Sequence, residues 1–194
     1  MNRRLLIIVL MACLLPLGMQ AQQGTFRFAQ LTDIHLTPNN PNPTEDLLRS
    51  VAQINATDSI DFVLVTGDLT EEGDRTTMEK VKSCLDLLKV PYHVVLGNHE
   101  TKWSDSGCTA FGEIFGGERF EFEHKGFLFL GFNSGPLMRM AYGHVVPQDI
   151  RWMTEEMDKN GKDKPVILVT HYPLMEGDRS EERRVGKECH YMGS

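Results

Sequence analysis

Apolar residues of this chain fall into short runs that alternate with stretches in which they recur at helical spacing. Residues 25–31, 60–66 and 92–96 read as β-strands, and the second of them is apolar enough to be buried on both faces. After each of the first two strands, apolar side chains recur three or four residues apart, which predicts a helix, with Thr44 and Asp74 as the expected N-caps. This order predicts a parallel βαβαβ core with right-handed crossovers.

The second half of the chain continues the α/β pattern. Phe and Glu alternate from residue 120 and an apolar run follows a Lys-Gly pair, which predicts a β-hairpin over residues 120–132. Pro147 predicts the first turn of a helix, and a further strand is expected over residues 166–170. Two loops, Thr101–Phe115 and Asn133–Pro147, join these elements. No linker composition interrupts the pattern, so we expect one domain.

The N-terminal segment has the layout of an export signal. Two arginines precede the apolar run Leu5–Leu17, and the polar junction Gln20–Gln22 follows it. The run is shorter than the roughly 20 residues of a membrane-spanning helix, so we expect a signal peptide over residues 1–21 and no stable membrane span after its cleavage. The mature protein would then be periplasmic or extracellular. A lipid anchor at Cys13 is the less favoured alternative, because apolar residues follow where a polar tether is expected.

Charge limits the classes of partner. The chain has 194 residues, with 20 Lys and Arg against 27 Asp and Glu, for a formal net charge of -7. Proteins that bind nucleic acid through its backbone carry an excess of basic residues, so we expect no nucleic acid as a structural partner. A phosphate-bearing small molecule must be attracted by positive charge held locally in a site.

Six polar residues follow the carboxyl ends of the predicted strands. They are Asp33, His35, Asp68, Asn98, His99 and His171. In open α/β sheets ligands bind at this edge, so we expect these residues to converge. Carboxylate, imidazole and amide oxygen form a donor set suited to zinc, manganese or iron, and a shared carboxylate can bridge two ions. Two such ions can clamp a phosphoryl group and supply hydroxide at neutral pH.

The motifs at these positions resemble those of a known family. Asp33-Ile34-His35, Gly67-Asp68, Gly97-Asn98-His99-Glu100 and His171 resemble, in order and strand context, the first four motifs of the calcineurin-like metallophosphoesterases. The resemblance implies an α/β fold of layered α-β-β-α sandwich type built on the βαβαβ core. It also implies a hydrolase acting on phosphoric ester bonds, with phosphomonoesters or phosphodiesters as small-molecule substrates and a metal-bridging hydroxide as the attacking group.

The resemblance also implies a ligand set for two divalent or trivalent metal ions, manganese, zinc or iron. Asp33 and His35 would bind one ion, Asp68 would bridge both, and Asn98 and His171 would bind the second.

The remaining roles concern the reaction itself. His99 would steady the transition state or protonate the leaving alkoxide, and Glu100 would support it from behind. Asp68 and His99 would thus be the catalytic residues, while Asn98 and His99 would contact the substrate. Substrate specificity would lie in the two loops named above.

One family motif is missing from the sequence. The family has a fifth motif, Gly-His-x-His, whereas Gly143-His144-Val145-Val146 comes early and lacks the second histidine. We therefore expect residues 24–178 to be a calcineurin-like phosphoesterase domain whose C-terminal part is missing. In residues 179–194 apolar side chains recur neither at helical spacing nor at strand spacing, so we expect a non-native or disordered tail. The alternative function is an inactive scaffold with weak metal binding, serving as a binding module or having no function.

Overall fold

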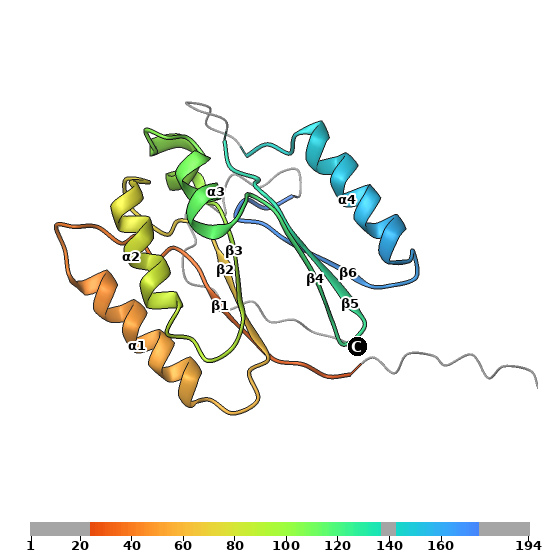
Figure 1. Ribbon diagram of the computed structural model, residues 1–194, viewed down its shortest axis with the longest axis horizontal. Coiled ribbons are helices and arrows are strands. Elements are labelled where there is room, and N and C mark those ends of the chain that lie inside the picture. The colour runs from red at the N-terminus through yellow and green to blue at the C-terminus, as the bar shows by residue number, and fades with distance from the viewer. Residues whose placement is uncertain (1–23, 137–142, 175–194) are drawn as a thin grey trace, which may run out of the picture.

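The computed structural model describes residues 24–136 and 143–174, which form two three-stranded sheets with helices on their outer sides (Figure 1). The expected signal peptide over residues 1–21, with Cys13, and the expected tail over residues 179–194 lie outside the described residues. Within the described ranges, no helix has the length and apolar character needed to cross a membrane.

The first sheet is the predicted βαβαβ core. It contains β1 (Phe28–Leu31), β2 (Phe62–Thr66) and β3 (Tyr92–Val95), which are parallel and lie in the order β1-β2-β3. The crossovers are α1 (Asn42–Ala56) and α2 (Arg75–Leu85). All five residues of β2 are buried, as its uninterrupted apolar sequence predicts. The first strand begins three residues later than predicted.

The two expected N-caps have different outcomes. Asp74 caps α2, because its Oδ1 accepts a hydrogen bond from the backbone N of Thr77 at 2.9 Å. The prediction for Thr44 is wrong, because α1 begins at Asn42 and Thr44 lies inside its first turn. Pro43 extends the helix in this direction, since a first-turn residue needs no N–H donor and proline already has a helical φ.

The second sheet contains β4 (Phe120–His124), β5 (Phe127–Gly131) and β6 (Val166–Val169). β4 and β5 form the predicted antiparallel hairpin, and β6 pairs with β5 in parallel after the crossover helix α4 (Pro147–Asn160). The expected loop over residues 101–115 is instead largely helical. It contains the end of a π-helical turn, η1 (His99–Trp103), and the short helix α3 (Thr109–Phe115).

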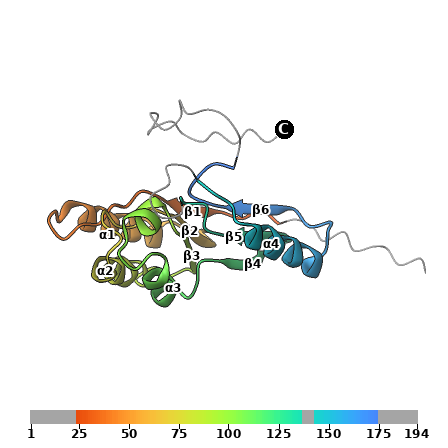
Figure 2. The ribbon, with the colours of Figure 1, turned by 90° about the horizontal axis from the view of Figure 1, so that it is seen from above.

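Two hydrophobic cores lie between layers of secondary structure. One core lies between the first sheet and helices α1 to α3, and it includes Val63, Val65, Met78 and Phe111. The other lies between the two sheets and is rich in phenylalanine, with Phe62 and Phe129 buried at its centre. Helix α4 lies on the outer side of the second sheet (Figures 1 and 2). The layers therefore follow the expected α-β-β-α order.

Candidate metal centre

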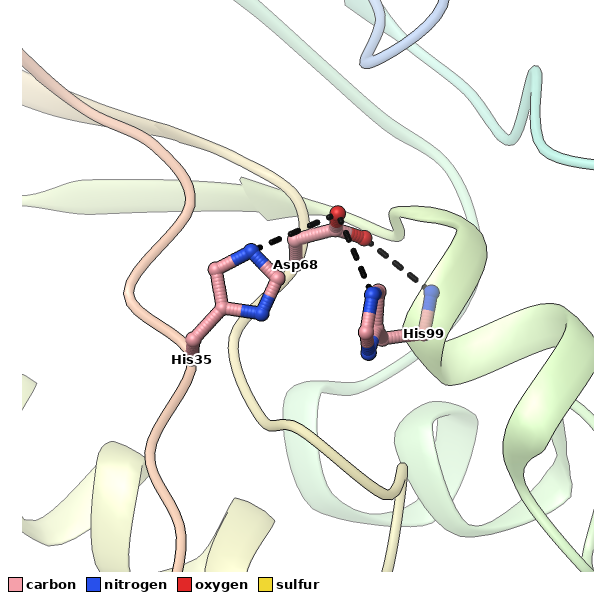
Figure 3. A group of neighbouring side chains, drawn as sticks. All are labelled: His35, Asp68 and His99. Carbon is pink, nitrogen blue, oxygen red and sulfur yellow. Dashed lines mark hydrogen bonds and ion pairs between the residues drawn. The ribbon is translucent and has the colours of Figure 1, made fainter. Parts of the chain in front are cut away.

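The residues predicted from the strand ends meet at one edge of the molecule. The parallel order of the first sheet places the connections after β1, β2 and β3 side by side, and the connection after β6 joins them from the second sheet. Asp68 lies at the centre of the group and is 4% exposed. Figure 3 shows its carboxylate facing the imidazoles of His35 and His99. The edge predicted from the chain direction is therefore where these side chains converge.

Three imidazoles direct the same ring nitrogen at Asp68. The Nε2 atoms of His35, His99 and His171 lie 3.8, 3.9 and 3.3 Å from Oδ2 of Asp68. The backbone N of His99 also donates a hydrogen bond to Oδ1 of Asp68 at 3.0 Å. One buried carboxylate is thus surrounded by three nitrogen donors, which is the arrangement expected when the carboxylate and imidazoles share cations.

The opposite ring nitrogen of each imidazole is held by an oxygen. Nδ1 of His171 lies 2.7 Å from the carbonyl O of Thr66, and Nδ1 of His99 lies 2.5 Å from the carbonyl O of Glu71. Nδ1 of His35 lies 3.0 Å from Oε2 of Glu71. Since a carbonyl only accepts, Nδ1 carries a proton in His99 and His171, so Nε2 is the lone-pair donor whenever the ring is neutral. This is the tautomer that a metal ligand requires.

Glu71 is a site residue that the sequence reasoning missed. Its carboxylate contacts His35 while its carbonyl contacts His99, so one residue orients two imidazoles. The backbone N of Glu71 in turn donates to the carbonyl O of Leu36 at 2.9 Å, which fixes the connections after β1 and β2 to each other. The sequence feature that could have indicated Glu71 is its position, three residues after Asp68 in the connection that follows β2.

Asp33 and Asn98 complete the group. Oδ1 of Asp33 lies 3.8 Å from Nε2 of His35, and Oδ1 of Asn98 lies 3.3 Å from Nε2 of His171. Asp33 is the most exposed member, with a side chain 50% accessible.

Two triads in this group have ligand atoms close enough to hold an ion. They are His35, Asp68 and His99, and Asp33, Asp68 and His171, each with its ligand atoms within 4.8 Å of one another. Both triads contain Asp68, as a bridging carboxylate would. One triad includes His99, which the sequence predicts to act on the transition state or the leaving group and not as a metal ligand. How the ligands divide between two ions stays a prediction.

The backbone carrying these ligands is unusual. Asp33, His35 and Asp68 have φ values of 53°, 49° and 51°, in the left-handed region that non-glycine residues seldom adopt. Such conformations cost of the order of 1–3 kcal/mol each and persist where surrounding contacts impose them. Here the backbone N of Asp33 donates to the carbonyl O of Gly67 at 3.1 Å, and that of His35 to the carbonyl O of Asp68 at 3.0 Å.

Glu100 lies behind the ligands and is completely buried. Its Oε1 accepts hydrogen bonds from the backbone N of Leu69 and Thr70 at 2.9 and 3.1 Å, and from the Thr70 hydroxyl at 3.3 Å. Its Oε2 accepts from the backbone N of Gly97 at 2.9 Å. Burial raises the pKa of Glu100 above its ordinary value. The carboxylate therefore ties the connection after β2 to the connection after β3, so it supports Asp68 and Asn98 through the backbone.

Asp68 and His171 shift each other's ionisation. Burial favours the neutral carboxyl, but the hydrogen bond to His171, the charge of His171 and the His99 amide outweigh it and hold the pKa of Asp68 below its ordinary value. Burial opposes the charged imidazole, but the contact with Asp68 outweighs it and raises the pKa of His171. Asp68 is therefore held as an anion, with His171 as its strongest partner.

The donor set fits two cations. It supplies carboxylate oxygens, imidazole nitrogens with the required tautomer, and an amide oxygen, all at one edge around a buried carboxylate. This is the borderline-hard set that zinc, manganese and iron prefer.

Comparison with known proteins agrees with this geometry. The sequence profile of the family described as calcineurin-like phosphoesterase matches residues 26–191. The chain belongs to this family. Calcineurin-like phosphoesterases share the α/β architecture described above, and typical members depend on two metal ions.

The chain was also compared with individual relatives and with solved structures. The chain is 33% identical over 164 residues to a probable cyclic nucleotide phosphodiesterase of Rhodopseudomonas palustris, covering 76% of this chain and 57% of that protein. It is 24% identical over 152 residues to a 3',5'-cyclic-nucleotide phosphodiesterase of Nostoc sp., covering 75% and 56%. The structure of a purple acid phosphatase from yellow lupin seeds aligns with a TM-score of 0.47 and 15% identity, covering 76% and 30%. The chain thus spans just over half the length of either phosphodiesterase.

Proposed function

We propose that the protein is a metal-dependent hydrolase of small-molecule phosphoesters, with phosphodiesters as its first class of substrate. The observation that carries the proposal is the pair of ligand triads that share the buried carboxylate of Asp68. Family membership supports the hydrolytic chemistry, and the two phosphodiesterase relatives support diesters over monoesters.

Two bound metal ions would neutralise the phosphoryl oxygens and provide a hydroxide nucleophile at neutral pH. The residues of the chain prepare for this chemistry. Asp68 holds negative charge between the triads, while Glu71 and Thr66 fix the imidazoles so that each Nε2 faces inward. The side chain of His99 is 17% exposed, so a bound ester would be able to reach it, and its protonated form would donate to the leaving oxygen.

The direct test measures metal content and turnover on the same preparation. The chain is loaded with manganese, zinc or iron, dialysed, and assayed against bis(4-nitrophenyl) phosphate and 4-nitrophenyl phosphate. We expect two ions per chain and faster hydrolysis of the diester. Two ions without hydrolysis of either ester would favour the binding-module alternative. Fewer than one ion per chain would reject the proposed centre.

Two variants separate the roles of the ligands. Asp68→Asn removes the shared charge, so we expect loss of both ions and at least a hundredfold lower turnover, in line with metal-centre substitutions that cost about 10–100-fold or more. His99→Ala should keep most of the metal while lowering kcat, as removal of an acid catalyst costs about 10²–10⁴-fold. Loss of both ions in His99→Ala would show instead that His99 is a ligand. Glu72→Gln, at an exposed position nearby, is the matched control and should change neither quantity.

We further propose that residues 1–21 direct export and that the mature protein acts outside the cytoplasm. The basic start, short apolar run and polar junction support this proposal. Expression with and without residues 1–21, followed by fractionation and N-terminal sequencing, tests it. Retention of the full-length chain in the cytoplasm would reject it.

A further inference from the structure

A cleft of about 560 Å³ lies among residues 117–149. Its walls come from the segment before β4, the segment after β5 and the first turn of α4, through Glu118, Arg119, Asn133, Gln148 and Asp149. Figure 1 shows the start of α4 at the same end of the molecule as α3. The volume falls within the range of roughly 300–1,000 Å³ that is typical of small-molecule sites.

Two contacts connect this cleft to the metal ligands. The backbone N of Tyr172, next to His171, donates to Oγ of Ser134 at 2.9 Å. Ser134 stands between two cleft residues, Asn133 and Gly135. Gly135 packs so closely on Thr101 that a Cβ would lie 2.8 Å from the Thr101 hydroxyl, which itself donates to the carbonyl O of Asn98 at 3.4 Å. One wall of the cleft is therefore joined by direct contacts to the segments that carry His171 and Asn98.

The arginine in the cleft is already neutralised. Nε of Arg119 donates to Oδ1 of Asp149 at 2.6 Å, and Asp149 is 5% exposed, so the pair is anchored in the protein. The guanidinium also lies over the ring of Trp152 at 5.5 Å. An unpaired arginine at this position would attract anions. The buried carboxylate of Asp149 instead removes most of its attraction for a second anion, leaving its remaining N–H groups as hydrogen-bond donors.

A second carboxylate in the cleft has no cationic partner among the described residues. Oε2 of Glu118 accepts from Nδ2 of Asn133 at 3.0 Å, a neutral donor, and the side chain is exposed. Among the described lining residues, the charged groups are therefore two carboxylates and one guanidinium, and His144 is the remaining titratable side chain. The cleft offers donors and acceptors for hydrogen bonds while its charge repels an added anion.

We propose that this cleft binds the organic group of the phosphoester and selects uncharged, hydrogen-bonding groups, such as a nucleoside, over groups that carry a second anion. The inference rests on the proposed function for the position of the phosphoryl group. Interactions between exposed charges are worth up to about 1 kcal/mol, which corresponds to about a fivefold change in affinity. Glu118 is the residue that sets this discrimination.

The experiment uses two probes that differ by one carboxymethyl group, which adds one negative charge. They are 3′-O-acetylthymidine 5′-monophosphate and 3′-O-succinylthymidine 5′-monophosphate, titrated calorimetrically into the manganese-loaded chain. We expect the acetyl probe to bind about fivefold more tightly. Glu118→Gln should bring the two affinities to within about twofold, whereas Glu155→Gln, the same charge change at an exposed position of α4, should keep the wild-type ratio. Equal affinities in the wild type, or an unchanged ratio in Glu118→Gln, would overturn the inference.

Hydrolysis of bis(4-nitrophenyl) phosphate by the same preparations separates this inference from the proposed function. Absence of hydrolysis with the expected affinity ratio would reject the proposed function and keep the cleft as a binding site. Hydrolysis without any difference in affinity between the probes would support the proposed function and reject the inference about the cleft. A further variant is Arg119→Met, which removes hydrogen-bond donors and leaves the charge of Asp149 uncompensated. It should weaken the binding of both probes, and that of the succinyl probe more than that of the acetyl probe.

Discussion

At Gly97 the backbone passes so close to Asp68 that a Cβ atom would lie 2.1 Å from Oδ1 and 2.2 Å from the backbone N of Asp68. We therefore expect Gly97→Ala to displace the carboxylate that both triads share. Metal affinity should fall at least tenfold, because a displaced shared ligand affects both ions. Calorimetric titration with manganese, together with metal content after dialysis, measures the change.

A second glycine supplies the control for this substitution. Gly112 lies inside α3 with nothing within 4 Å of its Cβ position. Gly112→Ala should leave manganese binding unchanged and stabilise the fold by about 0.5–1 kcal/mol, since alanine is the better helix residue. If Gly97→Ala bound manganese as well as Gly112→Ala does, the close approach at Asp68 would not matter to the centre.

Cys108 allows the electrostatics of the cleft wall to be tested without any ligand. Burial, with the nearby charge of Glu118, raises the pKa of the Cys108 thiol to about 12. A raised thiol pKa means less thiolate, so at pH 8 only about one thiol in ten thousand is ionised. We expect iodoacetamide to label Cys108 far more slowly in the folded chain than in urea, as followed by peptide mass spectrometry. Glu118→Gln should speed the folded-state reaction, and an unchanged rate would show that burial alone protects the thiol.

Among the secondary-structure elements, those with long apolar stripes could be predicted from the sequence. The parallel core, the hairpin and α4 follow from local spacing and from proline and glycine at their ends. The helix α3 was missed because it has only seven residues, and its stability comes from burying Ala110 and Phe111 in the core rather than from a repeating pattern. The start of α1 was misplaced because Thr44 is a good cap residue in isolation, whereas Pro43 allows the helix to begin earlier.

The candidate site could also be predicted only in part. Its edge could be predicted, because parallel strands deliver their following residues to one place. The supporting contacts could not, since they depend on three-dimensional distances. Glu71 reaches two histidines through different atoms, and the Thr66 carbonyl that orients His171 belongs to a residue without distinctive chemistry.

Glu100 connects the elements that carry the site, so its neutral analogue tests how firmly they are held. In the wild type, both carboxylate oxygens of Glu100 accept hydrogen bonds from backbone N–H groups. In Glu100→Gln, an NH₂ group replaces one of these oxygens and faces the same donors, with which it makes no hydrogen bond. We expect a loss of about 1–3 kcal/mol in the free energy of unfolding, the usual cost of an unsatisfied buried group. Urea denaturation of the apo chain measures it.

The matched control is again Glu72→Gln, whose side chain is exposed. It should change the free energy of unfolding by less than about 0.5 kcal/mol, as surface substitutions do. If Glu100→Gln were equally mild, the connections after β2 and β3 would be held by other contacts.

For the whole molecule, the candidate centre is a second junction between the two sheets. The first junction is the phenylalanine-rich core between them. At the metal centre, Asp33, Asp68 and Asn98 come from the first sheet and His171 follows β6 of the second. A metal ion held by Asp33, Asp68 and His171 would therefore link the sheets directly.

Metal binding should consequently stabilise the whole fold. With manganese at about 100 times its Kd, binding to the folded chain alone adds about 2.7 kcal/mol, which raises Tm by roughly 5–10 °C for a chain of this size. We expect calorimetry in manganese, compared with EDTA, to show this rise in the wild type. His171→Ala should lose most of it, because one imidazole and the link between sheets are absent. His144→Ala, an exposed histidine outside both triads, should keep it. A full rise in His171→Ala would mean that the first sheet binds the ions without the second, because the remaining triad of His35, Asp68 and His99 lies entirely on its connections.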